Sequence, residues 1–421
     1  MDLDHARSLD AADPLASFRE RFVIADSDQC YLDGNSLGRL PKSAAEAVEG
    51  VVREEWGKDL VTGWSRWIDT SLRTGDLIGS TVLGAQSGQT LATDTTSVNL
   101  YRLAVAAIRS RPNRSTILVD EANFPTDRYI FQGIAADLGM RLVTIPNEDP
   151  DLAECERITP ELLGKYLDDD VALVCLQVIN YRSGARQDVS ALTAIAREHG
   201  CHLLWDASHA VGSIDLAFDN WGVDLAVGCS YKYLNGGPGA PAWLFIRSDI
   251  QSELQTPIDG WFAQANQFEM GSEFTRAPGI RGFQIATPPV IALAAVQASL
   301  AIIAEAGMPS IETKCAAGTT FMVDLFDQWL APLGFTLHTP RAAHQRGGHV
   351  SLTHPDADRI SIALREVENV IPDFRKPNII RVAVAPLYTA YQEIFTGFDR
   401  LRDLVVSGRY ADFQPVNEGV T

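Results

Sequence analysis

The sequence predicts an α/β protein with a large, mostly parallel sheet covered by helices, followed by a smaller α+β domain. The chain has 421 residues, which is too long for one small core. Short β-branched runs alternate with helical patterns from about residue 115 to 248. Beyond about residue 310, one long helical pattern is followed by short strands. We expect an N-terminal segment at 1–48 that packs on the C-terminal domain, a large domain at 49–305 and a small domain at 306–421.

In the alternating region, each expected strand is a short apolar run, and the helices between them carry start or stop signals. Thr159-Pro160 starts one helix, because the hydroxyl caps free N–H groups and proline suits the first turn. Gly139 ends another, since glycine readily adopts the left-handed conformation. The expected strands are TILVD (116–120), RLVTIP (141–146), VALVCLQVIN (171–180), CHLLWDA (201–207) and VDLAVGCS (223–230), with helices at 127–139, 158–167 and 188–200.

The C-terminal part begins with two apolar helical patterns. The segment 290–307 follows Pro288-Pro289 and is interrupted by Gln297 and Ser299, which indicates a buried helix rather than a membrane span. A second helix is expected at 311–334, and the strands that follow are FTLHTP (335–340), GGHVSLTH (347–354) and NIIRVAVAP (378–386).

Charge and cysteine content exclude several classes of function. The net charge is −19, from 54 acidic and 35 basic residues, which disfavours nucleic acid and anionic membranes as partners. The six cysteines form no C-x-x-C pair, so neither a disulfide framework nor a zinc site is expected. The N-terminus lacks the apolar core of a signal peptide. We therefore expect a cytoplasmic protein with a small-molecule substrate and no metal.

Acidic and basic side chains follow two of the expected strands. Asp206 ends LLWD, and Lys232 lies just beyond DLAVGCS. Because parallel strands open onto one crevice at their C-terminal ends, both side chains are expected to reach the same ligand. A lysine that forms a Schiff base and a carboxylate that pairs with a pyridinium nitrogen indicate a pyridoxal 5'-phosphate site. His209, three residues after Asp206, is expected to orient that carboxylate by a hydrogen bond.

A phosphate site is expected at ATDTTSVNLYRLAVAA (92–107), where Thr95, Thr96 and Ser97 precede a strongly helical run. Hydroxyls and free backbone N–H groups converge at such a helix N-terminus. Taken singly, Asp206 also fits a helix cap and Lys232 a solvated loop residue. The combination of these residues favours a cofactor site.

Several segments resemble the kynureninase family of pyridoxal-phosphate enzymes, from about residue 30 to 395. The resemblance implies the aspartate-aminotransferase fold (fold type I), with a sheet of the seven-stranded type, and a homodimer whose active site is shared between subunits. The segments are YLDGNSLGRLP (31–41), NFPTD (123–127), WDASHAVG (205–212), WGVDLAVGCSYKYLNGGPGAP (221–241), GWF (260–262), ATPP (286–289) and IRVAVAPLYT (380–389).

The resemblance also implies a role for each matching residue. Lys232 matches the Schiff-base lysine, and Asp206 matches the partner of the pyridinium nitrogen. Tyr231 matches a tyrosine that forms a hydrogen bond with the phosphate and serves as a proton donor. Arg381 matches the arginine that binds the substrate α-carboxylate through its planar fork. The other matching positions are Phe124 and Asp127 at the cofactor ring, Thr96 and Ser97 at the phosphate, Trp261 and Thr287 reaching in from the partner subunit, and Ser36 and Trp64 lining the substrate pocket.

One position departs from the family pattern. Gln177 stands where the family often has a small hydroxylated residue, so it is left out of the expected site. Thr287 falls where some relatives carry Asn, which favours kynurenine over its 3-hydroxy form.

The implied reaction is hydrolytic Cβ–Cγ cleavage of L-kynurenine to anthranilate and L-alanine through quinonoid and ketimine intermediates. Its implied role is tryptophan degradation by the kynurenine pathway, linked to NAD biosynthesis. The alternatives are a cysteine desulfurase-like lyase, an aminotransferase, a relative that cleaves a ring-substituted kynurenine, and a binding protein without catalysis. Cys315, the one late cysteine, lies in a helical pattern, which disfavours the desulfurase.

Overall fold

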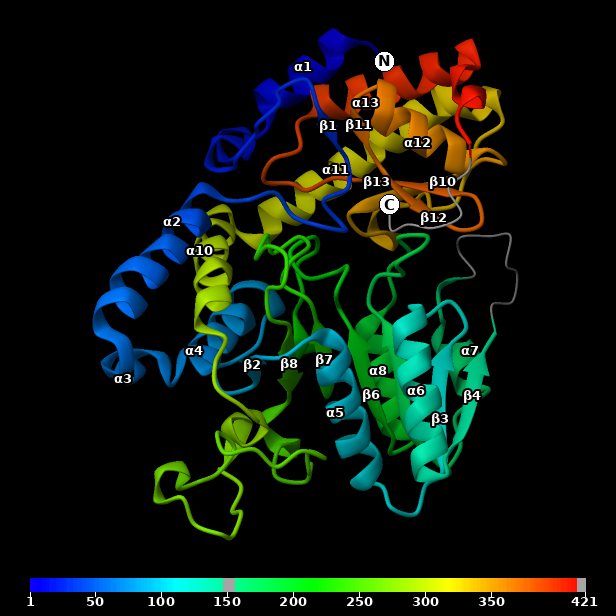
Figure 1. Ribbon diagram of the computed structural model, residues 1–421. Coiled ribbons are helices and arrows are strands. Elements are labelled where there is room, and N and C mark those ends of the chain that lie inside the picture. The colour runs from blue at the N-terminus through cyan, green and yellow to red at the C-terminus, as the bar shows by residue number, and fades with distance from the viewer. Residues whose placement is uncertain (147–155, 415–421) are drawn as a thin grey trace.

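The computed structural model describes residues 1–146 and 156–414. Its largest sheet has seven strands and lies in the lower part of the view in Figure 1. The strand order is β2-β8-β7-β6-β5-β3-β4, in which β7, β6, β5, β3 and β4 are mutually parallel. The expected mostly parallel sheet is therefore confirmed. The strands are β2 (Thr90–Ala92), β3 (Thr116–Asp120), β4 (Arg141–Ile145), β5 (Val171–Gln177), β6 (His202–Asp206), β7 (Leu225–Gly228) and β8 (Trp243–Ile246).

Two neighbouring strands at one end of the sheet, β2 and β8, were not expected from the sequence. β8 runs antiparallel to β7, and β2 runs antiparallel to β8. β2 has three residues and β8 has four, too few to display a strand period. The connection between β7 and β8 carries Lys232.

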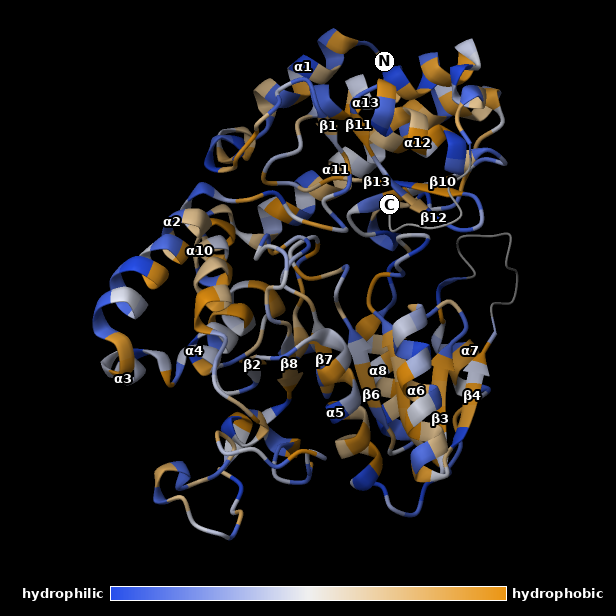
Figure 2. Ribbon diagram, viewed as in Figure 1, coloured by the Kyte–Doolittle hydropathy of each residue, from blue (hydrophilic) through white to orange (hydrophobic). Residues whose placement is uncertain are grey.

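Helices cover both faces of the sheet (Figure 1). Each face has its own hydrophobic core. Leu203 belongs to one core and Leu204 to the other, because successive side chains of a strand point to opposite faces. Figure 2 shows these strands as largely hydrophobic ribbon, as expected for a sheet buried on both sides. One face packs α5 (Thr96–Arg109) and α6 (Pro125–Leu138), and the other packs α4 (Thr70–Ile78), α8 (Val189–Glu198) and α10 (Val290–Ala306).

The C-terminal part contains a four-stranded antiparallel sheet with the order β12-β13-β10-β9. A third core joins this sheet to the helices that cover it. The helices and strands of the C-terminal part are α11 (Met308–Leu325), β9 (Thr336–Leu337), β10 (His349–Thr353), α12 (Ala357–Val367), β11 (Val370–Ile371), β12 (Asp373–Arg375), β13 (Ile379–Ala383) and α13 (Tyr391–Ser407).

The N-terminal segment packs against these C-terminal elements. β1 (Cys30–Tyr31) pairs in parallel with β11, and α1 (Leu3–Ala12) contacts α13. The buried ion pair between Lys314 and Asp13, at 2.6 Å, fastens the segment to α11. The domain limits near residues 48 and 305 stay predictions.

The remaining helices are α2 (Lys42–Gly50), α3 (Trp64–Trp67), α7 (Pro160–Gly164) and α9 (Phe218–Trp221). Within the described ranges, no single helix is both long and apolar enough to cross a membrane. Together, α10 and the segment Met308–Leu333 meet that criterion by length and composition, but the pair bends by 82°.

Candidate functional site

A cavity of about 390 Å³ opens at the C-terminal edge of the parallel strands. It lies where β6 and β7 end, as expected for a ligand site in a sheet of this kind. Nine of the residues expected from the sequence line it: Thr95, Thr96, Ser97, Phe124, Asp127, Asp206, His209, Tyr231 and Lys232.

Asp206 at the end of β6 and Lys232 in the loop after the neighbouring β7 both line this cavity. Asp206 is the last residue of β6, and its Oδ1 accepts a hydrogen bond from the Ser208 backbone N–H at 2.9 Å. Burial raises the pKa of Asp206, while the Ser208 hydrogen bond and the Lys232 charge act in the opposite direction. A buried carboxylate of this kind needs a positive partner, which suits it to hold a protonated ring nitrogen.

His209 does not make the contact expected from the sequence. Its Nε2 lies 2.9 Å from Nζ of Lys232, and its Nδ1 has no hydrogen-bond partner in the described structure. The prediction that His209 orients Asp206 is therefore corrected: His209 holds Lys232. Asp206 is the last residue of β6, whereas His209 lies in the turn that follows the strand.

The N-terminus of α5, where the sequence predicts a phosphate site, borders the cavity. Thr95 is the N-cap residue, and its hydroxyl accepts a hydrogen bond from the Val98 N–H at 3.3 Å. Thr96 and Ser97 begin the first turn, where backbone N–H groups have no partner within the helix. Their hydroxyls add further donors, so a phosphate group suits this place.

Phe124 and Asp127 lie at the start of α6, with Pro125 in its first turn. The ring of Phe124 meets the ring of Tyr181 edge to face, with centroids 5.2 Å apart. Asp127 is almost completely buried, and its Oδ2 has no hydrogen-bond partner among the described residues. Burial and the neighbouring Asp206 raise the pKa of Asp127 well above its ordinary value. An unpaired buried carboxyl oxygen that faces this cavity indicates a missing polar ligand.

Tyr231 borders the cavity beside Lys232, whose Nζ lies 5.8 Å from the centre of the tyrosine ring. Burial, followed by the influence of Cys229, raises the pKa of Tyr231. The phenol therefore keeps its proton at neutral pH, as a proton donor must.

Arg381 lies in β13 of the C-terminal domain and is 1% exposed, and neither it nor Ser36 is among the residues that line the cavity. Its guanidinium pairs with Asp373 and donates to the carbonyl of Tyr181, a residue whose side chain lines the cavity. Nη2 also donates to Oγ of Ser36 at 3.3 Å. Burial lowers the pKa of Arg381, and Asp373 opposes that effect. Arg381 and Ser36 are thus brought together near the cavity, from opposite ends of the chain.

Three expected residues lie elsewhere in this chain. Trp64 packs against Trp67 and lines a separate apolar groove rather than the cavity. Trp261 is 45% exposed, and Thr287 is also exposed. The resemblance expects Trp261 and Thr287 to act from a partner subunit, so their absence from the lining of this cavity is compatible with that prediction.

Gln177, which was left out of the expected site, lines the cavity. Its side chain donates to the Ala122 carbonyl at 3.2 Å and accepts from the Tyr181 N–H at 3.1 Å, so it joins two loops of the site. Other residues that line the cavity were not predicted from the sequence, among them Thr126, Tyr181, Ser208 and Cys229. The rule that ligands bind beyond strand C-termini points to all of these positions, because each lies within a few residues of a strand end or a helix start.

The fold is shared with solved structures of other enzymes. A cysteine desulfurase from Thermococcus onnurineus NA1, in its apo form, has a TM-score of 0.79 at 17% identity, covering 93% of this chain and 98% of that one. A mutant of C-DES, with glycine covalently linked to the PLP cofactor, has a TM-score of 0.76 at 20% identity, covering 90% and 97%. At such low identity the likeness establishes the fold, which is fold type I of the pyridoxal-phosphate enzymes.

The sequence comparisons identify the family. Residues 311–401 match the model of the kynureninase C-terminal domain. A kynureninase from Pseudomonas fluorescens is 36% identical over 413 residues, covering 97% of this chain and 96% of that protein. A kynureninase from Burkholderia pseudomallei (strain K96243) is 36% identical over 412 residues, covering 96% and 95%. On this evidence, the chain belongs to the kynureninase family.

Proposed function

We propose that this protein cleaves L-kynurenine hydrolytically at the Cβ–Cγ bond to give anthranilate and L-alanine, with pyridoxal 5'-phosphate as cofactor. One observation carries the proposal: Lys232, Asp206 and the α5 N-terminus meet in one cavity in a member of the kynureninase family. In the cell, the proposed role is cytoplasmic tryptophan degradation, which also feeds NAD biosynthesis.

The residues present fit this cofactor. Lys232 suits the aldehyde, Asp206 the ring nitrogen, and the first turn of α5 the phosphate. The unpaired Oδ2 of Asp127 supports a polar ligand at this place. When bound, pyridoxal phosphate supplies an electron-withdrawing ring that stabilises negative charge on the substrate.

The protein side chains then have distinct tasks. Arg381 binds the substrate carboxylate, exchanging one of its hydrogen bonds, and Ser36 steadies the guanidinium. Lys232 removes and returns protons at the substrate, while His209 holds the Lys232 amine at 2.9 Å. Tyr231 keeps a proton to donate to the developing carbanion at Cβ.

The buried thiols disfavour the desulfurase alternative. That chemistry requires a reactive thiolate on an accessible segment. Cys315 is 2% exposed within α11, and burial raises the pKa of its thiol to about 12. Cys229 borders the cavity, but burial raises the pKa of its thiol too. Cys155 lies outside the described residues.

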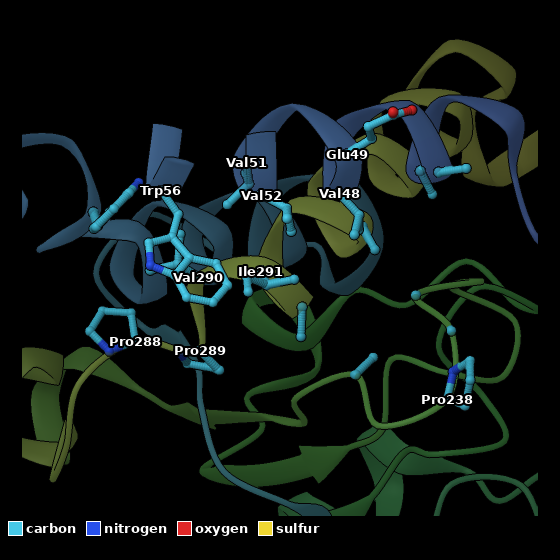
Figure 3. A pocket seen from close by; sticks show the side chains of 18 of the residues that line it. Val48, Glu49, Val51, Val52, Trp56, Pro238, Pro288, Pro289, Val290 and Ile291 are labelled. Atoms are coloured by element: carbon cyan, nitrogen blue, oxygen red, sulfur yellow. The ribbon is translucent and has the colours of Figure 1, made fainter. Parts of the chain in front are cut away.

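We further propose that the protein is a homodimer whose subunits meet over an apolar groove of about 1010 Å³. Figure 3 shows Val48, Val52 and Trp56 on one side of the groove, with Val290 and Ile291 on the other. Trp56 is 56% exposed and Ile291 is 40% exposed, an unusual amount of apolar surface for a monomer. Gly236, Gly237 and Ala240 continue the groove toward the cavity, which Ala240 also lines. A partner seated here would lie next to the active site.

Anthranilate fluorescence tests the proposed reaction directly. The wild-type protein with added cofactor is expected to release anthranilate from L-kynurenine without any keto-acid acceptor, whereas Lys232→Ala is expected to release none. A parallel assay with 3-hydroxykynurenine compares the two substrates. No product from wild-type protein with bound cofactor would contradict the proposal and favour an aminotransferase or a ring-substituted substrate. Product from Lys232→Ala would contradict the role of Lys232.

A further inference from the structure

A second histidine, His349, lies beside the site without a known task. It is the first residue of β10 and is 0% exposed. In the register of β10 and β13, Ser351 lies opposite Arg381. Since side chains two residues apart share a face of a strand, His349 and Arg381 project from the same face of the small sheet. The two residues therefore belong to one rigid unit of the C-terminal domain.

His349 contacts the residue that holds Lys232. The ring centroids of His349 and His209 are 5.5 Å apart, with the planes tilted by 59°. Neither ring nitrogen of His349 makes a well-formed hydrogen bond within the described residues, although the Tyr181 backbone lies near enough to favour its charged form slightly. A buried imidazole with unsatisfied nitrogens is costly, so a structural role alone explains it poorly.

The surroundings of the two imidazoles are strongly cationic. Burial first, and then the neighbouring positive charges, lower the pKa of both histidines well below the ordinary value. Both rings are therefore neutral at physiological pH, and a neutral ring has one lone pair that accepts a hydrogen bond. The charged groups that face the pair are Lys232 from the large domain, Arg381 from β13 and Arg375 from β12, with Asp373 of β12 bound to both arginines.

We propose that His349 is a positioning residue that holds His209 so that its Nε2 accepts a hydrogen bond from the protonated nitrogen of Lys232, whether that nitrogen is free or linked to the cofactor. Because His349 moves with Arg381, it links the carboxylate-binding position of the C-terminal domain to the proton state of Lys232. No proton transfer to His349 is required. The inference rests on the proposed function in one respect, the assignment of Lys232 as the cofactor lysine.

The test is a pH titration of the visible absorbance of the bound cofactor, which reports the proton state at Lys232 without any turnover. In His349→Phe, the larger ring at this 0% exposed position displaces the His209 ring packed against it, and the protonated Lys232 nitrogen loses its acceptor. The midpoint is expected to move to lower pH by about one unit. His349→Gln, which keeps polar atoms at similar length, is expected to lie between Phe and wild type. The exposed His344 of the same segment provides a matched control, and His344→Phe is expected to leave the midpoint unchanged.

A double-mutant cycle shows whether His349 acts through His209. If it does, His209→Gln combined with His349→Phe shifts the midpoint no further than His209→Gln alone. With kynurenine as substrate, kcat is expected to fall about 10-fold in His349→Phe while KM changes less than about 2-fold.

Unchanged midpoints in both folded His349 variants would overturn the proposal, as would additive shifts in the cycle. Folding is checked by circular dichroism, and His349→Gln keeps the test open if the Phe variant misfolds. Failure of the proposed function would give different results. The wild-type protein would then release no anthranilate, or Lys232→Ala would retain the titrating absorbance, whatever residue stands at position 349.

Discussion

At the scale of single residues, the charge of Asp206 matters more than its shape. Asn at this position keeps the size of the side chain and an oxygen for the Ser208 N–H, but it removes the negative charge. Loss of about 3 kcal/mol of charge-assisted interaction corresponds to roughly a 100-fold loss of rate. We expect Asp206→Asn to lower kcat by at least about 100-fold, with a smaller change in cofactor affinity. Steady-state kinetics and equilibrium dialysis of the cofactor measure the two effects, and near-normal kcat would contradict the pairing with the ring.

The buried carboxyl group of Asp120 is expected to make the stability of the folded protein depend on pH. Asp120 ends β3, its Oδ1 accepts from the Ala122 N–H at 2.8 Å, and burial raises its pKa to about 7. Because the folded state favours the protonated acid, this contribution to stability is complete below about pH 4 and is lost as pH rises through about 7. Asn imitates the protonated form at every pH.

We therefore expect Asp120→Asn to gain stability relative to wild type between about pH 4 and pH 8, by up to roughly 4 kcal/mol. Differences in Tm between the two proteins, measured across this range, give the result. A difference that stays constant with pH would show that Asp120 is ionised in the folded protein throughout.

At the scale of elements, the loop that carries Lys232 is held by the N-terminal segment. The Gly38 N–H donates to the Tyr231 carbonyl at 2.9 Å. A Cβ at Gly38 would lie 2.4 Å from the Lys232 carbonyl oxygen and 2.8 Å from Cα of Asn235. Since both are backbone atoms, the loop itself must move to admit a methyl group. This contact gives the GNSLG segment (34–38) a physical reason to contain glycine.

Gly38→Ala is accordingly expected to weaken cofactor binding by about 10-fold or more, because overpacking of about 1–3 kcal/mol is relieved by displacing the Lys232 loop. Fluorescence titration with the cofactor measures the affinity. Gly50→Ala in α2 is the control, since nothing lies within 4 Å of its added Cβ. Equal affinities for wild type and Gly38→Ala would mean that the loop tolerates the shift.

At the scale of the whole molecule, the exposed apolar groove predicts that two copies of the chain form a dimer. An acidic side chain at the exposed Trp56 would be buried without a partner if a second subunit covers it. We expect wild type to sediment as a dimer and Trp56→Glu to sediment largely as a monomer with reduced cofactor affinity. Val406→Glu on α13, at a position 67% exposed and outside the groove, is expected to remain dimeric. A monomeric wild type, or a dimeric Trp56→Glu, would contradict this interface.

The sequence by itself determined the parallel strands and the residues that follow them. Thr96, Asp206 and Lys232 lie next to the ends of elements whose periodicity and caps are local, so their meeting at one sheet edge follows from the fold class. The short antiparallel strands β2 and β8 were missed because they owe their form to their neighbours in the sheet.

Tertiary structure alone decided how the C-terminal domain completes the site. Arg381 meets Ser36, which precedes it by 345 residues, and only the folded chain sets the distance between them. The resemblance named both residues, but it did not reveal that His209 turns toward Lys232 or that His349 packs behind it. Side-chain orientation at such a site depends on burial and on charges from several elements. A local pattern in the sequence specifies neither of these.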